Sequence, residues 1–398
     1  MSSAVIVSTV RTPMGRYGGA LSGVRPDDLA AQVLAAAAEQ AGLAGRDFDD
    51  VYVGCGNQAG EENRNVARMA ALLAGFPVEV PGCTVNRLCG SGMEAVAVAA
   101  RAVEADGGEA FLAGGVESMS RAPYAMAKPS RAFPRGAAKL EDTALGWRFV
   151  NPRLEEMGHT DSLGQTAENV AREQGISREE QDRFALNSHR KAVRAAEGGG
   201  GEWLLPVEAK GGEVVADEGP RADTSLERLA ALRPVFAADG SVTAGNSSPL
   251  SDGAAALAIV SEDFARSRGL RPRARILGSA TAGVAPRVMG LGPLPATAKL
   301  TAKLGISVAD FDTIELNEAF ASQAVAVCKE WGIDPEDDRV NPNGGAIALG
   351  HPIGCSGARL VGEVVRNLDA GGGRLGLATM CIGVGQGIAL AVERIEEA

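Results

Sequence analysis

The chain has 398 residues, of which 45% are hydrophobic and 22% are charged, and its formal net charge is −11. This length predicts two or three domains or an internal duplication, and the negative charge argues against nucleic acid as a partner. The sequence has neither an apolar run long enough for a membrane span nor the basic start of a signal peptide, so we expect a cytoplasmic protein.

Cysteine and histidine usage limits the kinds of site to be considered. The six cysteines form no C-x-x-C pair, and the chain has only three histidines. This pattern favours reduced thiols over a disulfide framework and argues against a metal site.

The first predicted elements are a strand, a helix and a second strand. The segment 48–54, "FDDVYVG", is typical of a buried strand after an acidic turn. Ser91 and Glu94 have the spacing of a capping box, which predicts a helix that begins near residue 91 and ends at Gly107. The continuously apolar stretch "AFLAGGV" that follows predicts a strand buried on both faces.

Residues 119–250 differ from the segments on either side, and we expect them to form an inserted loop domain. They begin with a stretch rich in Pro, Arg and Lys, which could bind phosphates. A helix is predicted from a capping box at Ser177 and Glu180 to the glycine run at 198–201.

An internal repeat organises the rest of the chain. Residues 48–54 match 311–317, and residues 91–118 match 356–383. The repeat predicts an α/β fold built from two duplicated halves with layered sheets and helices. We expect domains at 1–118 with about 251–270, at 119–250 and at 271–398.

Cys89, in the stretch "NRLCGSGM", is a candidate nucleophile. It lies just before the predicted helix, whose dipole and free N–H groups would lower the pKa of the thiol. Gly90 and Gly92 would let a substrate approach the backbone closely. The alternative is a buried structural cysteine, which is the usual state of a free thiol.

The second half contributes three further candidates. His351 lies in the glycine-rich stretch "NPNGGAIALGHPIGCSG", at the start of the duplicated helix. Asn317 and Cys381 each end a predicted strand, where sites in α/β sheets assemble. A pseudo-twofold relation between the halves would bring these residues to Cys89, whereas a structural role for the histidine is the alternative.

Six motifs give the chain a resemblance to the thiolases over essentially its whole length. They are "NRLCGSGMEA", "GGVESMS", "TAGNSSPLSDGAAA", "NEAF", "NPNGGAIALGHPIGCSGARL" and "CIGVGQG". The resemblance implies two βαβαβ-type halves in a layered α-β-α-β-α core. It also implies reversible cleavage of a 3-oxoacyl-CoA by CoA, with CoA as a substrate and no permanently bound cofactor.

The resemblance assigns roles to the candidate residues. Cys89 is expected to carry the acyl group as a thioester, His351 to take its proton, and Cys381 to act as acid and base. Asn317 is expected to hold a water in one oxyanion hole with His351, and the N–H groups of Cys89 and Gly383 to form the other.

For CoA, the resemblance points to a second set of residues. The pantetheine contact is expected at Ser248, and the acyl and pantetheine tunnel at Leu163, Ala319 and Phe320. Arg221 is expected near the adenine or the phosphates, and a solvated loop charge is its alternative.

A subgroup is indicated by residues 139–157, which resemble thiolases that act on 3-oxoadipyl-CoA in aromatic-compound degradation. Four nearby cations could face the distal carboxylate of such a chain or, alternatively, solvent or the CoA phosphates; they are Arg131, Arg135, Lys139 and Arg148. Acetoacetyl-CoA and plain 3-ketoacyl-CoA substrates are the alternatives. Ser162 and Leu163 replace the His-Met pair of biosynthetic acetoacetyl-CoA thiolases.

Other functions remain as rival hypotheses. A decarboxylating ketoacyl synthase would lack the second catalytic cysteine, a non-catalytic lipid carrier would have lost a reactive residue, and a cysteine hydrolase would release free acid. The family resemblance further implies a homodimer or homotetramer, with Arg64 and Asn65 on the intersubunit side.

Overall fold

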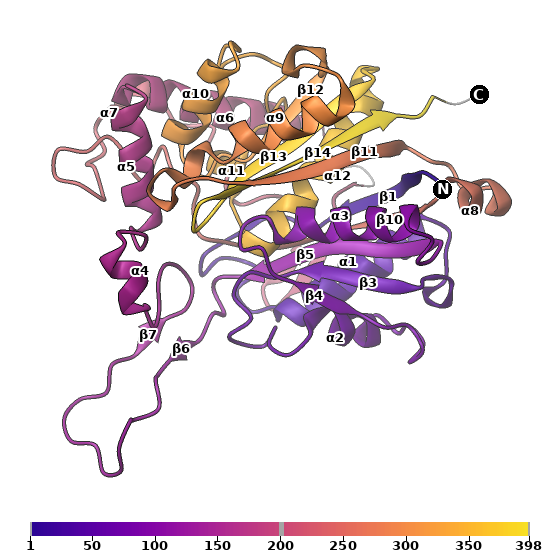
Figure 1. Cartoon of the computed structure of the whole chain (residues 1–398), viewed down its shortest axis with the longest axis horizontal. Coiled ribbons are helices and arrows are strands. Elements are labelled where there is room, and N and C mark those ends of the chain that lie inside the picture. Colours follow the sequence, from indigo (N-terminus) through magenta and orange to yellow (C-terminus); the bar gives the residue numbers. More distant parts are fainter. Residues whose placement is uncertain (1, 199–202, 397–398) are drawn as a thin grey trace.

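The computed structural model describes residues 2–198 and 203–396, in which strands and helices alternate through most of the chain (Figure 1). The strands are β1 (Ala4–Arg11), β2 (Gly15–Arg16), β3 (Asp50–Gly54), β4 (Cys83–Val85), β5 (Ala110–Ser118), β6 (Tyr124–Ala125), β7 (Glu141–Asp142), β8 (Val207–Ala209), β9 (Gly212–Val214), β10 (Ser251–Ser261), β11 (Ala274–Gly283), β12 (Thr313–Leu316), β13 (Leu375–Ile382) and β14 (Gln386–Arg394). The helices are α1 (Pro26–Gln40), α2 (Val66–Leu73), α3 (Ser91–Glu104), α4 (Pro152–Glu156), α5 (Leu163–Glu173), α6 (Arg178–Glu197), α7 (Leu226–Ala230), α8 (Glu262–Arg268), α9 (Pro293–Leu304), α10 (Ala321–Glu330), α11 (Ala346–Leu349) and α12 (Ile353–Gly371).

Two similar sets of strands form the main sheet. Its order is β12-β13-β14-β11-β1-β10-β5-β3-β4. In the N-terminal half β3 is parallel to β5, and in the C-terminal half β12 is parallel to β13. The two halves are joined by a short pairing of β1 with β11, so they form one continuous sheet.

Helices cover both faces of each half. The helices α3 and α12 pack against each other between the two sets of strands, α1 covers the outer side of the N-terminal set, and α9 covers that of the C-terminal set (Figure 1). This arrangement confirms the layered α/β fold. It also brings the start of α3 close to the start of α12.

The duplication is visible in the way that each half fastens its strands. A short 3-10 turn precedes both β3 and β12. Asp49 then accepts a hydrogen bond from the N–H of Ala110 at the start of β5, and Asp312 accepts one from Leu375 at the start of β13. An aspartate at the equivalent position therefore links equivalent parallel strands in each half.

The start of α3 differs from the prediction. The N-cap is Gly90 rather than Ser91, and the helix has no side-chain cap. The Ser91 hydroxyl instead donates to the carbonyl of Leu88 and accepts the N–H of Arg87. The predicted capping box is wrong because the polar groups of Ser91 close the preceding turn, while Glu94 pairs with arginines.

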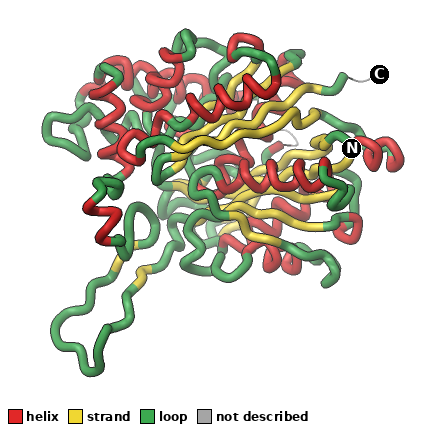
Figure 2. Tube along the Cα trace, in the orientation of Figure 1, coloured by secondary structure: helices red, strands yellow, loops and turns green. Residues whose placement is uncertain are grey.

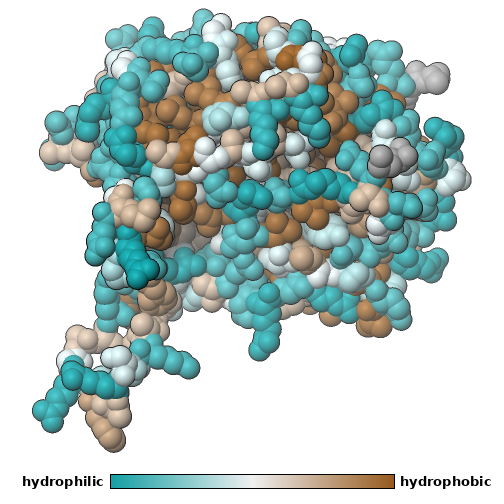
Figure 3. Space-filling view, viewed as in Figure 1, coloured by the Kyte–Doolittle hydropathy of each residue, from teal (hydrophilic) through white to brown (hydrophobic). Residues whose placement is uncertain are grey.

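The segment 119–250 lies outside the layers and includes a long arm between β6 and β7 (Figure 2). The arm exposes apolar side chains, among them Phe133 and Leu140 (Figure 3). Strand β10, which follows this segment, pairs with β1 and β5. The domain boundaries given above stay a prediction.

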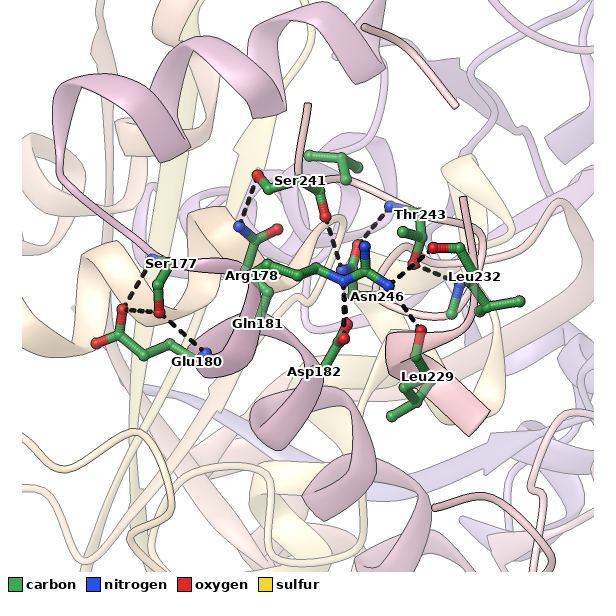
Figure 4. Close-up of polar contacts among 12 residues, drawn as sticks. Ser177, Arg178, Glu180, Gln181, Asp182, Leu229, Leu232, Ser241, Thr243 and Asn246 are labelled. Atoms are coloured by element: carbon green, nitrogen blue, oxygen red, sulfur yellow. Dashed lines mark hydrogen bonds and ion pairs between the residues drawn. The ribbon is translucent and has the colours of Figure 1, made fainter. Parts of the chain in front are cut away.

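Helix α6 organises the rest of this segment. Its predicted capping box is confirmed, since Ser177 and Glu180 bond reciprocally. Further along the helix, Asp182 accepts from the Asn246 amide, which holds the loop leading to Ser248 (Figure 4). The helix ends at Glu197, and most of the glycine run, 199–201, lies outside the described residues.

Across residues 2–198 and 203–396, no helix is long and apolar enough to cross a membrane.

Candidate active site

A cavity of about 180 Å³ opens where the two halves meet the inserted segment. Cys89 lines it from the N-terminal half, Gly383 from the C-terminal half and Leu163 from α5. Much of the remaining wall is apolar, including Leu88, Met119, Leu145, Trp147, Met289, Ile353 and Val384. A charge inside such a wall is poorly solvated, so a few polar groups dominate its electrostatics.

Cys89 occupies the turn that leads into α3, and its side chain is only 8% exposed. The preceding Leu88 has a φ of 47°, a left-handed backbone conformation that is costly for a branched residue. Burial raises the pKa of the Cys89 thiol, and a hydrogen bond from the Gly383 N–H acts in the opposite direction. The expected lowering of this pKa is therefore wrong, because desolvation outweighs the backbone hydrogen bonds.

Cys381 lies near the end of β13 and is buried among Leu163, Met289, Ala319 and Phe320. Burial raises the pKa of this thiol well above its usual range, and Cys89, when ionised, raises it further. The two thiols are therefore within electrostatic range of each other. Cys381 packs against Leu163 and Met289, which line the cavity that holds Cys89, and a shared catalytic site for the two thiols stays a prediction.

His351 follows α11 and is buried beside Asn317. Its Nε2 lies 3.3 Å from the Asn317 Nδ2, and its Nδ1 lies 2.6 Å from the Ser356 hydroxyl. That hydroxyl donates to the carbonyl of Pro352, so it accepts the proton of Nδ1 and leaves Nε2 as the unprotonated, basic nitrogen. Burial, with a smaller contribution from the positive charge of Arg359, lowers the pKa of His351 to about 4, so the imidazole is neutral at pH 7.

Sequence reasoning missed Ser356 and Glu117. Glu117 is fully buried at the end of β5 and accepts N–H groups from Gly56, Asn57 and Gly354, which joins the two halves beside the cavity. Burial raises its pKa to about 7. The serine five residues after His351, in the first turn of α12, and the acid inside an apolar strand were the available signals.

The residues predicted to contact CoA lie in different places: four are at or near the cavity, and one is outside it. Leu163 lines the cavity, while Ala319 and Phe320 pack around Cys381. The Ser248 hydroxyl donates to the carbonyl of Ala319, at 3.0 Å. Arg221 is exposed and its N–H donates to His189, and it does not line this cavity.

The four cations that could face a distal carboxylate also lie in different places. Arg148 lines the cavity. Lys139 pairs with Glu141 on the arm, at 2.8 Å, and Arg131 and Arg135 are exposed there.

Together these groups can perform thiol chemistry at a carbonyl. A buried thiol has a backbone N–H at its sulfur, a second thiol lies nearby, and a neutral imidazole has its basic nitrogen beside a side-chain amide. Such an arrangement provides a nucleophile, a base and hydrogen-bond donors for an oxyanion. Within the part of the chain that the structure describes, no group of three or more His, Cys, Asp or Glu could hold a metal ion.

Comparison with known proteins adds three kinds of similarity. The family models for the thiolase N-terminal and C-terminal domains match residues 4–263 and 270–394. The beta-ketoadipyl-CoA thiolase of Pseudomonas aeruginosa is 56% identical over 396 residues, covering 98% of each chain. The 3-oxoadipyl-CoA/3-oxo-5,6-dehydrosuberyl-CoA thiolase of Escherichia coli K12 is 54% identical over 402 residues, covering 99% of this chain and all of that one.

Among solved structures, human mitochondrial 3-ketoacyl-CoA thiolase in complex with CoA superposes with a TM-score of 0.92 at 38% identity. It covers 99% of this chain and 98% of the human one.

Proposed function

Since the chain belongs to the thiolase family and is an acyltransferase, we propose that it cleaves 3-oxoadipyl-CoA with CoA to succinyl-CoA and acetyl-CoA. The reaction type follows from the family, and the acyl chain is suggested by relatives that share more than half of its residues. The observation that carries the proposal is Cys89 in the cavity wall with the second buried thiol, Cys381, packed against Leu163 and Met289 of the same wall.

In the first half-reaction, Cys89 attacks the 3-oxo carbon while His351 Nε2 takes the thiol proton. The bond between C2 and C3 then breaks, which leaves a succinyl thioester on Cys89 and the enolate of acetyl-CoA. Cys381 gives its proton to C2, and acetyl-CoA leaves. The raised pKa of Cys381 suits a thiol that must exchange a proton with carbon.

In the second half-reaction, the thiolate of Cys381 takes the proton of the incoming CoA thiol. The CoA sulfur attacks the thioester, and Cys89 leaves as a thiolate that recovers its proton from His351. Thioester exchange between two thiols is nearly balanced, so this half-reaction runs in both directions.

Two oxyanion sites are proposed. The N–H groups of Cys89 and Gly383 would bind the oxygen of the tetrahedral intermediates. His351, once protonated at Nε2, would bind the enolate oxygen together with a water held by Asn317, whose Oδ1 has no protein partner. One such donor is typically worth about 10²–10³ in rate.

For CoA, we propose that pantetheine passes Ser248 and Leu163 toward Cys381, between Ala319 and Phe320. Arg221 would approach the adenine or the phosphates from outside the cavity. We also propose a homodimer or homotetramer. The strand β4 is the last in the sheet order, which leaves one edge for another copy near Arg64 and Asn65.

Substrate choice is tested with the purified enzyme, CoA and three substrates: 3-oxoadipyl-CoA, 3-oxohexanoyl-CoA and acetoacetyl-CoA. The loss of enolate absorbance measures each cleavage rate. We expect the highest kcat/KM with the dicarboxylic compound. Equal kcat/KM values for all three substrates would reject 3-oxoadipyl-CoA as the preferred substrate.

The roles of the two cysteines are tested by substitution. Cys89→Ala should abolish the acyl-enzyme, which intact-protein mass spectrometry detects. Cys381→Ala should still be acylated but should lose exchange of the acetyl α-protons with solvent. Normal exchange in that variant would show that its assigned role is wrong.

A further inference from the structure

The cavity wall contains one Arg or Lys among the residues that the structure describes, and that residue is Arg148. It is half-buried, and it shares the cavity with the nucleophile Cys89. A single cation in a largely apolar pocket has a strong effect on which ligands bind there, because the surroundings screen its charge poorly.

Arg148 has no carboxylate partner in the described parts of the chain. Its Nη2 donates to the side-chain oxygen of Asn57, at 2.8 Å, and to the carbonyl oxygen of the same residue, at 3.3 Å. Both partners are neutral. The guanidinium therefore keeps its positive charge uncompensated and retains donors for a ligand.

The two acids on the cavity wall are engaged elsewhere. Glu117 accepts backbone N–H groups from Gly56, Asn57 and Gly354, and Asp161 accepts the amide of Asn169. Neither forms an ion pair with Arg148. The cation is thus available to an anion that enters the cavity.

The segment that carries Arg148 is fixed in place. Thr143 donates to the carbonyl of Pro123 and accepts the amide of Asn57, and the Trp147 ring N–H donates to the carbonyl of Asp161. The side chain is thus braced by Asn57 while its own segment is held on both sides. A braced guanidinium loses little freedom when it binds a carboxylate in the bidentate manner.

We propose that Arg148, braced by Asn57, forms a subsite for the distal carboxylate of the acyl chain and gives the enzyme its preference for dicarboxylic 3-oxoacyl-CoA substrates. The inference rests on the proposed function and deepens it. In a succinyl group on Cys89 the carboxylate lies three carbon–carbon bonds from the thioester, and Leu88, Met119 and Ile353 offer apolar wall for the methylene carbons between.

The test compares 3-oxoadipyl-CoA with 3-oxohexanoyl-CoA, which has the same chain length and a methyl group in place of the carboxylate. In Arg148→Met the ratio of the two kcat/KM values should fall about 100-fold, mainly through KM for the dicarboxylic substrate. Arg148→Lys should restore part of the ratio, because the charge remains but the bidentate geometry is lost.

Asn57→Asp tests the charge with almost no change of shape. The new carboxylate would pair with the guanidinium and repel the substrate carboxylate, so the same ratio should fall about tenfold or more. Arg131→Met, which removes an exposed arginine of the arm, is the matched control and should leave the ratio unchanged.

The outcomes separate the two proposals. If the wild-type enzyme and Arg148→Met both prefer 3-oxoadipyl-CoA to the same degree, the subsite alone is overturned. Wild-type enzyme with no such preference would overturn the dicarboxylic substrate itself. An equal loss on both substrates together with a raised KM for CoA would assign Arg148 to CoA and reject the subsite.

Discussion

Cys89 shows how burial changes the chemistry of a residue whose position was predicted correctly. A thiol at a helix start is expected to ionise easily, but the cavity around it is largely apolar and the side chain is almost completely buried. Desolvation raises its pKa above the usual value of the thiol. Burial therefore favours the neutral thiol of Cys89, and in the proposed mechanism the neutral imidazole of His351 removes its proton.

The pH dependence of alkylation tests this protonation state. In a Cys83→Ser variant, which lacks the exposed cysteine, the rate of Cys89 modification by iodoacetamide should rise with pH through 7 to beyond 9. The sign follows from the raised pKa, because the reactive thiolate becomes dominant only above it. Modification at Cys89 is followed by peptide mass spectrometry. A rate that levels off below pH 7 would instead indicate the low pKa of an ion pair.

At the scale of the elements, the crossing of α3 and α12 positions the nucleophile. A Cβ added at Gly92 would lie 2.6 Å from the carbonyl oxygen of Gly354 and 2.8 Å from the N–H of Ala358. At Gly357, on the other helix, it would lie 2.4 Å from the N–H of Met93. The two helices approach this closely only because both positions lack a side chain.

Gly92→Ala should destabilise the protein by about 1–3 kcal/mol, since backbone atoms cannot move aside as a flexible side chain can. It should also lower kcat, because Cys89 lies at the same helix end. Gly371→Ala is the control: it lies in the last turn of α12 with nothing within 4 Å of an added Cβ, and it should be neutral or slightly stabilising. Urea denaturation measures both. Equal stability of the two variants would contradict the close crossing.

At the scale of the whole molecule, a buried ion pair fastens the inserted segment to the core. Arg11 at the end of β1 donates to both oxygens of Asp217, at 2.6 and 2.8 Å. Burial acts to raise the pKa of Asp217, but the charge and hydrogen bonds of Arg11 outweigh it and lower that pKa below its usual value. The pair joins residues that lie more than half of the chain apart.

Asp217→Asn should cost about 3 kcal/mol, because it leaves the Arg11 charge buried without a counter-ion. Asp263→Asn, which breaks an exposed pair with Arg266, should cost less than about 1 kcal/mol. Thermal unfolding measures the difference. The contribution of the Asp217 pair is present above the unfolded pKa near pH 4 and is lost as the pH falls through the lower folded value, so the two variants should converge in acid.

The amino-acid sequence alone determined the duplicated α/β halves and most of the candidate site, because hydrophobic periodicity and motif spacing are local properties. The strands around residues 50 and 313 and the helices after Cys89 and His351 followed from these patterns. The assignment of Ser91 as a helix cap failed, since its hydroxyl had a competing partner in the preceding turn.

The tertiary structure decided what depends on distant contacts. It showed that Cys89 is desolvated, that Ser356 sets the tautomer of His351, and that Arg148 rather than three neighbouring cations lines the cavity. The physical reason is that a pKa, a tautomer and the environment of a charge depend on which remote groups exclude water around them. The spacing of residues along the chain does not indicate which distant groups these are.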